Sequence, residues 1–180
     1  KAANLKKRVK SYFLSSHNRK TEELVRRIKD IDYEKTDSAL EALILEADLI
    51  KKHKPPFNIK EKDDKSFLWV EITDEKFPRV LLVRGKTKPK GKRFGPFTSS
   101  SNIRNAMKIL RKIFPYNTHK PEKIGKFKRP CTYAQIGLCP GTCTGDIKRE
   151  EYLENIKSLE KVLKGKMKSL IKELEEKMEK

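Results

Sequence analysis

The sequence has few cysteines, few acidic residues and no long apolar run. No segment approaches the roughly 20 apolar residues of a membrane helix, and no apolar stretch of signal-peptide type is present. We therefore expect a cytoplasmic protein with no membrane partner. Its 25 Asp and Glu residues are outnumbered by 44 Lys and Arg residues, a formal net charge of +19. Such a surplus repels itself in a folded protein, so nucleic acid is the favoured partner. The alternative is a soluble, Lys-rich protein of ribosomal or thermophilic type.

All three cysteines lie close together, at Cys131, Cys139 and Cys143. An odd, clustered set in a cytosolic protein indicates metal ligation rather than disulfides. The spacing is not the paired CxxC of a zinc ribbon, so zinc is the less favoured metal. His119, upstream of Cys131, is the candidate for a fourth ligand. The alternative is three reduced structural thiols and a surface histidine.

Apolar periodicity predicts an α+β protein whose residues 1–60 form a small α/β unit. Its elements are expected to be helices at 2–13 and 21–29, a short edge strand at 31–35, and a third helix capped by Asp37 or Ser38. The third helix must end before the double proline at 55–56, because the residue before a proline disfavours the helical conformation.

The remaining chain is expected to form three further segments, 61–115, 116–146 and 147–180. The first holds strands at 67–73 and 79–84, a mobile basic loop at 85–93, and a helix from Ser101 or Asn102 to about Phe114. The second is rich in cysteine. The third is helical, with a weak point at Gly165 and an apolar stripe made of Leu163, Met167, Leu170, Leu174 and Met178. That stripe can face a partner or pack on the rest of the chain.

One carboxylate of the third predicted helix has an unusual setting. The residues three and four positions from Glu46 are all apolar, namely Ala42, Leu43, Leu49 and Ile50. A carboxylate inside an apolar stripe needs a compensating cation. That cation is either a basic side chain in a buried salt bridge, which base rates favour, or a metal ion.

A cation, a guanidinium and a phenol share one face of the first predicted helix. At about 100° per residue, Lys1, Arg8 and Tyr12 fall within a narrow sector. Such groups can stabilise charge on a reacting phosphodiester and handle a proton. A basic helix can equally be solvated or contact phosphates. Asn58, after the double proline, could orient a ligand or simply form a turn.

Short motifs along nearly the whole chain are similar to those of UvrC nucleases of the GIY-YIG class. In chain order they are Lys1–Val9 with Ser11–Phe13, Lys20–Thr21, Glu41–Glu46, Leu49–Lys51, Pro55–Ile59, Asp63–Ser66, Phe77–Arg79, Phe94–Phe97 and the block from Arg129 to Cys143. Each motif is weak alone, but the ordered set is specific.

This resemblance implies a nuclease of nucleotide excision repair that cuts damaged double-stranded DNA on the 3′ side of a lesion. It implies basic catalytic roles for Lys1 and Arg8, a supporting phenol at Tyr12, a Mg²⁺ or Mn²⁺ ligand at Glu46, and Asn58 at the rim of the site. The cysteine segment would hold an iron–sulfur cluster, with His119 in place of the family's fourth cysteine. The implied partners are DNA and the UvrB helicase subunit, with no small-molecule substrate.

The strands that carry the GIY and YIG tyrosines would precede Lys1. We therefore expect a truncated copy of the enzyme that cannot cut DNA by itself. The main alternative is a non-catalytic, basic DNA-binding or scaffold protein. A third possibility, an RNA- or ribosome-associated protein, explains the charge but neither Glu46 nor the cysteines.

Overall fold

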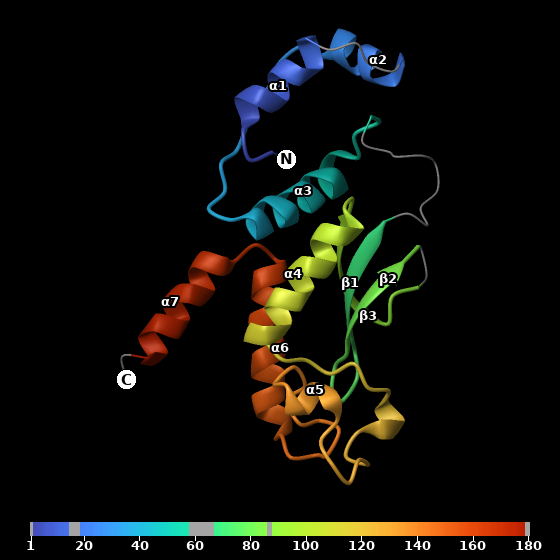
Figure 1. Ribbon diagram of the computed structural model, residues 1–180, viewed down its shortest axis with the longest axis vertical. Helices are drawn as coiled ribbons and strands as arrows, with labels where there is room; N and C mark the ends of the chain where they lie inside the picture. Colours follow the sequence, from blue (N-terminus) through green and yellow to red (C-terminus); the bar gives the residue numbers. More distant parts are fainter. Residues whose placement is uncertain (1, 15–18, 58–66, 86–87, 179–180) are drawn as a thin grey trace. The chain divides into compact units, whose positions relative to one another are not determined.

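The computed structural model describes residues 2–14, 19–57, 67–85 and 88–178. The chain divides into two compact units, Lys1–Asp63 and Asp64–Lys180 (unit 1 and unit 2), and each is considered by itself (Figure 1). The predicted α+β class is confirmed, because helices accompany a three-stranded antiparallel sheet. Among the described residues, no helix combines the length and the apolar character that crossing a bilayer requires.

Unit 1 contains three described helices, α1 (Leu5–Leu14), α2 (Arg19–Arg27) and α3 (Ala39–His53). The predicted cap of α3 is confirmed, because Ser38 Oγ accepts a hydrogen bond from the Glu41 N–H at 3.1 Å. The predicted end is also confirmed, since Lys54 adopts a left-handed conformation with φ 45° directly before the prolines. The buried residues of α3 are Leu43, Ile44 and Ala47.

The predicted edge strand at 31–35 is wrong. The backbone there forms no strand, and the two apolar side chains, Ile31 and Tyr33, are 45% and 70% exposed. Their period-two spacing resembles a strand, but a strand needs a neighbour to pair with. The described part of unit 1 offers no strand to pair with this segment.

Unit 2 contains an antiparallel sheet in the order β2-β1-β3. The predictions of β1 (Leu68–Thr73) and β2 (Val80–Arg84) are confirmed. The loop predicted to extend to Arg93 is wrong from residue 91 onward, where β3 (Gly91–Phe97) begins. Glycine is required at the start of β3, because a Cβ on Gly91 would lie 2.1 Å from the carbonyl oxygen of Ile72.

A buried ion pair joins the two strands β1 and β3. Glu71 and Arg93 face each other in the register, and Glu71 Oε2 accepts hydrogen bonds from Arg93 Nε at 3.0 Å and Nη2 at 2.5 Å. The Glu71 side chain is only 4% exposed. A buried carboxylate needs such a cation, so a charged residue inside a strand here stabilises the pairing.

Helices pack along one side of this sheet (Figure 1). They are α4 (Ser100–Ile113) and α6 (Arg149–Leu163), with short turns η1 (Pro121–Lys123) and α5 (Thr132–Gln135) between them in the chain. Helix α7 (Met167–Met178) follows α6 and lies away from the sheet (Figure 1). Helix α4 is capped by Ser99, two residues earlier than predicted, because its Oγ accepts from the Asn102 N–H. The buried side chains of α4 and α6 form the core with those of β1: Ile103, Met107, Leu110, Tyr152, Ile156, Leu159, Leu68, Val70 and Ile72.

The predicted weak point at Gly165 is confirmed, since α6 ends just before it and its φ is +74°. The apolar stripe is therefore divided between two helices. Leu163 and Leu170 are both buried within the chain, so they belong to its core rather than to a continuous partner-facing surface.

Candidate functional site

The three cysteines and His119 converge at one end of unit 2. Their ligand atoms all lie within 4.8 Å of one another, with His119 Nε2 3.3 Å from Cys131 Sγ. Cys139 and Cys143 are buried, whereas His119 and Cys131 are half-buried. We call these four residues the Cys/His cluster. They form a possible metal site, as the sequence predicted.

The electrostatic surroundings favour a neutral imidazole at His119 and a thiolate at Cys143, but oppose a thiolate at Cys131. Burial, together with the charges of Arg111 and Lys123, lowers the pKa of His119. Burial raises the pKa of Cys131. Burial also opposes ionisation of Cys143, but hydrogen bonds from the Cys131 backbone N–H and from the neighbouring thiols outweigh it, so the pKa of Cys143 lies below its ordinary value.

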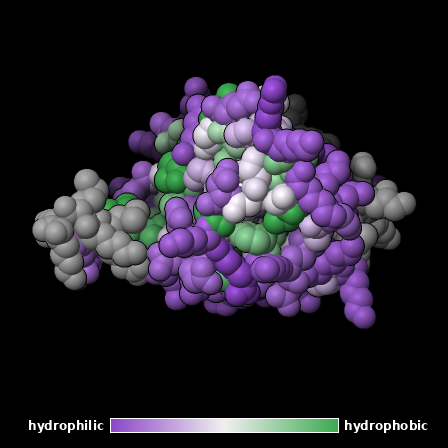
Figure 2. All heavy atoms as spheres, turned by 90° about the horizontal axis from the view of Figure 1, so that it is seen from below, coloured by the Kyte–Doolittle hydropathy of each residue, from purple (hydrophilic) through white to green (hydrophobic). Residues whose placement is uncertain are grey.

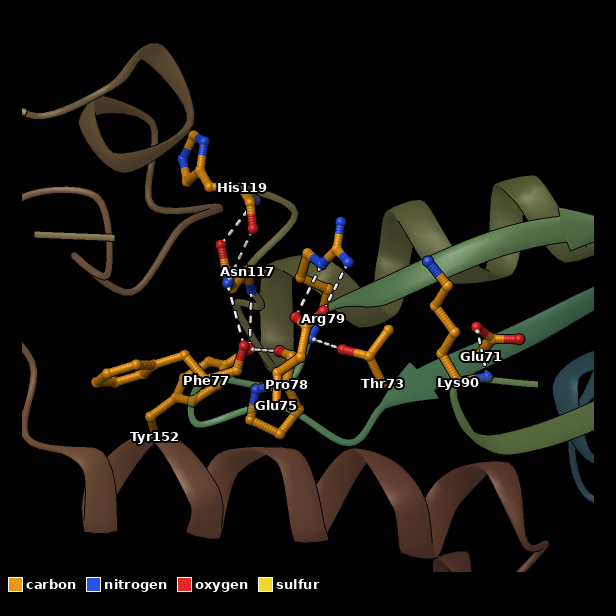
Figure 3. A network of polar contacts seen from close by, with 10 residues as sticks. All are labelled: Glu71, Thr73, Glu75, Phe77, Pro78, Arg79, Lys90, Asn117, His119 and Tyr152. Atoms are coloured by element: carbon orange, nitrogen blue, oxygen red, sulfur yellow. Dashed lines mark hydrogen bonds and ion pairs between the residues drawn. The ribbon is translucent and has the colours of Figure 1, made fainter. Parts of the chain in front are cut away.

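A buried hydrogen-bond network holds the cluster's histidine in place (Figure 3). Asn117, fully buried, accepts from the His119 N–H at 2.7 Å through its side-chain oxygen. Its side-chain amide donates to the carbonyl oxygens of Phe77 and His119. Its backbone N–H donates to the hydroxyl of Tyr152 at 3.0 Å, and that hydroxyl donates to the carbonyl of Pro78. The turn between β1 and β2, helix α6 and the cluster are thus tied together by Asn117 and Tyr152.

The donor set fits a thiophilic metal. Around a single tetrahedral ion, sulfur and nitrogen donors stand about 3.5–3.8 Å apart, because the bonds are about 2.0–2.3 Å long. In an iron–sulfur cluster the ligands bind separate irons and stand farther apart. The observed spread of up to 4.8 Å is closer to the first geometry than to the second.

In unit 1 the structure brings two of the predicted catalytic residues together. Arg8 Nη2 donates to the Tyr12 hydroxyl at 3.1 Å, and the guanidinium lies 5.1 Å from the centre of the Tyr12 ring. Both lie on α1, one turn apart, as the helical spacing predicts. Arg8 is exposed and Tyr12 is half-buried, so the pair can meet a ligand from solvent.

Glu46 lies on α3 in a setting only partly as predicted. Its Oε2 atom is buried, and Leu43 and Ala47 beside it are buried. Leu49, however, is 44% exposed, so the apolar stripe is open on that side. A carboxylate oxygen is a suitable ligand for a hard divalent cation. The two other predicted residues, Lys1 and Asn58, lie outside the described residues.

Sequence reasoning missed the residues that support the cluster. Asn117 and Tyr152 carry no metal-binding or catalytic motif, and their partners are far away in the chain. The available signal was the position of Asn117 two residues before His119, since Asn side chains often bond the backbone two residues on.

Known families match both units. The family described as "UvrC-like GIY-YIG domain" matches residues 1–59, and the family described as "UvrC/Cho excinuclease, middle domain" matches residues 67–162. The chain is 41% identical over 180 residues to a UvrABC system protein C of Moorella thermoacetica, and this match covers 99% of the chain and 29% of that protein. It is 45% identical over 179 residues to a UvrABC system protein C of Methanococcus maripaludis, covering 99% of this chain and 33% of that protein. No solved structure matches the chain.

With a UvrC middle-domain match over most of unit 2, and with relatives above 40% identity along the whole chain, this chain belongs to the UvrC family. It spans about a third of the length of the curated relatives that it matches.

Proposed function

We propose that this chain is part of an excision endonuclease that incises damaged DNA, on the 3′ side of the lesion, in nucleotide excision repair. The observation that carries this proposal is the match of residues 1–59 to a UvrC-like GIY-YIG domain that contains the Arg8–Tyr12 pair. The formal net charge of +19 supports a polyanionic substrate. Chromosomal DNA as substrate places the protein in the cytoplasm.

Within unit 1 each proposed residue has a distinct task. Arg8 binds a non-bridging oxygen of the scissile phosphate, because its fork of N–H donors matches phosphate geometry. Tyr12 accepts a hydrogen bond from Arg8, which orients the phenol toward the same phosphate. For Lys1 we propose a contribution of positive charge, and for Asn58 a supporting role that the family resemblance implies. Glu46 binds the divalent cation, Mg²⁺ or Mn²⁺, which when bound supplies Lewis-acid stabilisation of charge on the phosphodiester.

The test is an incision assay in a protein of the relatives' full length that carries this chain. We expect Glu46→Gln to lower 3′ incision of a lesion-containing duplex by more than 100-fold while leaving DNA affinity within about twofold, because a metal ligand acts on the chemistry. Asp48→Asn is the matched control, since Asp48 lies on the same helix and is exposed. Cutting by Glu46→Gln at the control's rate in Mg²⁺ would remove Glu46 from the mechanism.

For the Cys/His cluster we propose an iron–sulfur cluster with His119 as one ligand. The cysteine spacing, which differs from that of a zinc ribbon, supports this choice. A single zinc ion is the alternative, and the spread of 4.8 Å among the donors supports it. Iron and sulfide analysis of anaerobically purified protein, beside zinc analysis, separates the two.

A second candidate function is a non-catalytic DNA-binding or scaffold role, in which unit 2 recruits the UvrB helicase subunit to DNA. The match of residues 67–162 to the UvrC middle domain supports this candidate, because these residues lie outside the part of the chain that matches the GIY-YIG domain. DNA binding without incision by the full-length protein, with or without Glu46, would favour it.

A further inference from the structure

A basic, partly aromatic surface covers the Cys/His cluster. From residue 120 to residue 130 the chain carries five basic residues and one acidic residue, Glu122. The five are all exposed: Lys120, Lys123, Lys126, Lys128 and Arg129. We call residues 120–130 the basic segment. Such a density of positive charge is suited to the backbone of a nucleic acid.

Exposed apolar side chains lie within the basic segment and directly after it. Ile136 is 60% exposed, Tyr133 is 46% exposed and Phe127 is 37% exposed. Figure 2 views the chain from the end where these loops lie in Figure 1, and it shows hydrophobic and intermediate residues in the centre with hydrophilic residues around them. A purely solvated basic surface would leave this centre unexplained.

Contacts with Arg111 fix the position of the Tyr133 ring. The guanidinium of Arg111 lies 4.2 Å from the centre of the Tyr133 ring and 4.7 Å from that of the buried Tyr116. Arg111 is itself fixed, since its Nε donates to the Leu138 carbonyl at 2.8 Å and its Nη2 to the Tyr116 carbonyl at 3.2 Å. Arg111 thus contacts the Tyr133 ring, and nearly half of the Tyr133 side chain remains exposed to solvent.

The basic segment is attached to the cluster's loops by backbone hydrogen bonds. The Gly125 N–H donates to the Thr142 carbonyl at 3.0 Å, and the Phe127 N–H donates to the Cys143 carbonyl at 3.1 Å. Phe127 also contacts the ring of His119, with centres 5.4 Å apart. The position of the positive charges therefore depends on the loops that carry the cluster.

We propose that this surface binds single-stranded DNA, with a base stacked on Tyr133 and the backbone phosphates on Lys126, Lys128 and Arg129. A fixed, open aromatic ring can stack only on an unpaired base, because the faces of paired bases are covered by their neighbours. Charge complementarity selects a polyanion over an apolar protein partner. The inference rests on the proposed function only for the choice of DNA over RNA.

The test measures fluorescence anisotropy of a labelled mixed-sequence single strand with the whole 180-residue chain, without added Mg²⁺. Tyr133→Ala should weaken binding about tenfold, whereas Tyr133→Phe should stay within twofold, because the ring carries the stacking. Lys126→Gln with Lys128→Gln should lower the slope of log affinity against log salt by about 1.4, roughly 0.7 per lost phosphate contact. Metal content and the fluorescence of Trp69, the single tryptophan, verify that each variant is folded.

The matched control removes the same charge elsewhere. Lys166 and Lys172 are exposed and follow the C-terminal end of α6 in the chain. Helix α6 is about 22 Å long, because its 15 residues each rise about 1.5 Å. Lys166→Gln with Lys172→Gln should leave the affinity within twofold. Equal losses in the two lysine pairs, or wild-type binding by Tyr133→Ala, would overturn the proposal.

Two further outcomes also count against it. Equal affinity for a duplex of the same length would refute the preference for unpaired bases, and tighter binding of RNA would refute DNA as the partner. These readouts involve no cleavage. Failure of the Glu46 incision test would leave them unaffected, so the two proposals can fail separately.

Discussion

Substitution of Tyr152 by Phe removes a single oxygen atom from the buried hydrogen-bond network that links helix α6 to the turn between β1 and β2. The Tyr152 side chain is fully buried, and burial raises the pKa of its hydroxyl, so the group remains a protonated donor. The hydroxyl donates to the Pro78 carbonyl and accepts from the Asn117 N–H. Phenylalanine fills nearly the same volume but leaves both backbone groups without this partner.

The expected cost follows from those two groups. Each buried polar group left unsatisfied costs about 1–3 kcal/mol, and part of this is offset because the hydroxyl need no longer be desolvated. We therefore expect Tyr152→Phe to lower the free energy of unfolding of unit 2 by about 2–4 kcal/mol, and its Tm by roughly 8–15 °C. Urea unfolding followed by the fluorescence of Trp69 measures unit 2 specifically, because Trp69 is the single tryptophan and lies on β1.

Tyr133→Phe is the matched control, since it removes the same atom from a ring that is 46% exposed, and we expect a change below about 0.5 kcal/mol. Because Asn117 also holds His119, Tyr152→Phe should weaken metal affinity about tenfold in a competition with a chelator. If the free energy of unfolding of Tyr152→Phe lies within about 0.5 kcal/mol of the wild-type value, the network does not stabilise unit 2.

Three other predictions address the sheet, the end of α3 and the response to acid. Gly91→Ala should destabilise unit 2 by about 3 kcal/mol, because the added Cβ would collide with a backbone carbonyl of β1. Gly85→Ala is the control, since the added Cβ meets open space, and the substitution should cost about 1 kcal/mol for the left-handed backbone alone. Urea unfolding followed by Trp69 fluorescence compares the two variants. Lys54→Gly should relieve a left-handed conformation and slow amide hydrogen exchange in α3 by about threefold; faster exchange would contradict this. The hydrogen bond from Arg79 lowers the pKa of Glu75 below its ordinary value, so the stabilising effect of this pair is present above the unfolded-state pKa and is lost as the pH falls through the folded-state pKa. The difference in urea midpoint between wild type and Glu75→Gln should therefore shrink steadily as the medium is acidified, and a difference that stays constant on acidification would refute the assignment.

Local signals in the sequence were sufficient for much of the fold. Ser38 before an apolar helix and the prolines after it define both ends of α3, because capping and proline geometry act within a few residues. The Cys/His cluster was also predictable, since an odd, tightly spaced group of cysteines favours metal ligation over disulfides. The pairing of Arg8 with Tyr12 follows from helical spacing alone.

The parts that sequence reasoning missed depend on partners distant in the chain. Strand β3 contains two glycines and a proline, so its propensity is poor, and it forms because Gly91 allows close approach to β1 and Arg93 meets Glu71. The segment at 31–35 shows the opposite case: its alternating apolar residues suit a strand, but the described part of unit 1 contains no strand for it to pair with. Asn117 supports His119 through groups on another turn and another helix, which no local pattern reveals.

Metal analysis of the whole chain, purified without oxygen, tests most directly whether the Cys/His cluster organises unit 2. We expect stoichiometric iron with sulfide and a brown colour in the wild type, and the loss of both in Cys139→Ser together with lower stability of unit 2. Stoichiometric zinc would replace the iron–sulfur assignment and keep the metal centre. A metal-free wild type that unfolds at the same urea concentration as Cys139→Ser would contradict a metal centre at these four residues.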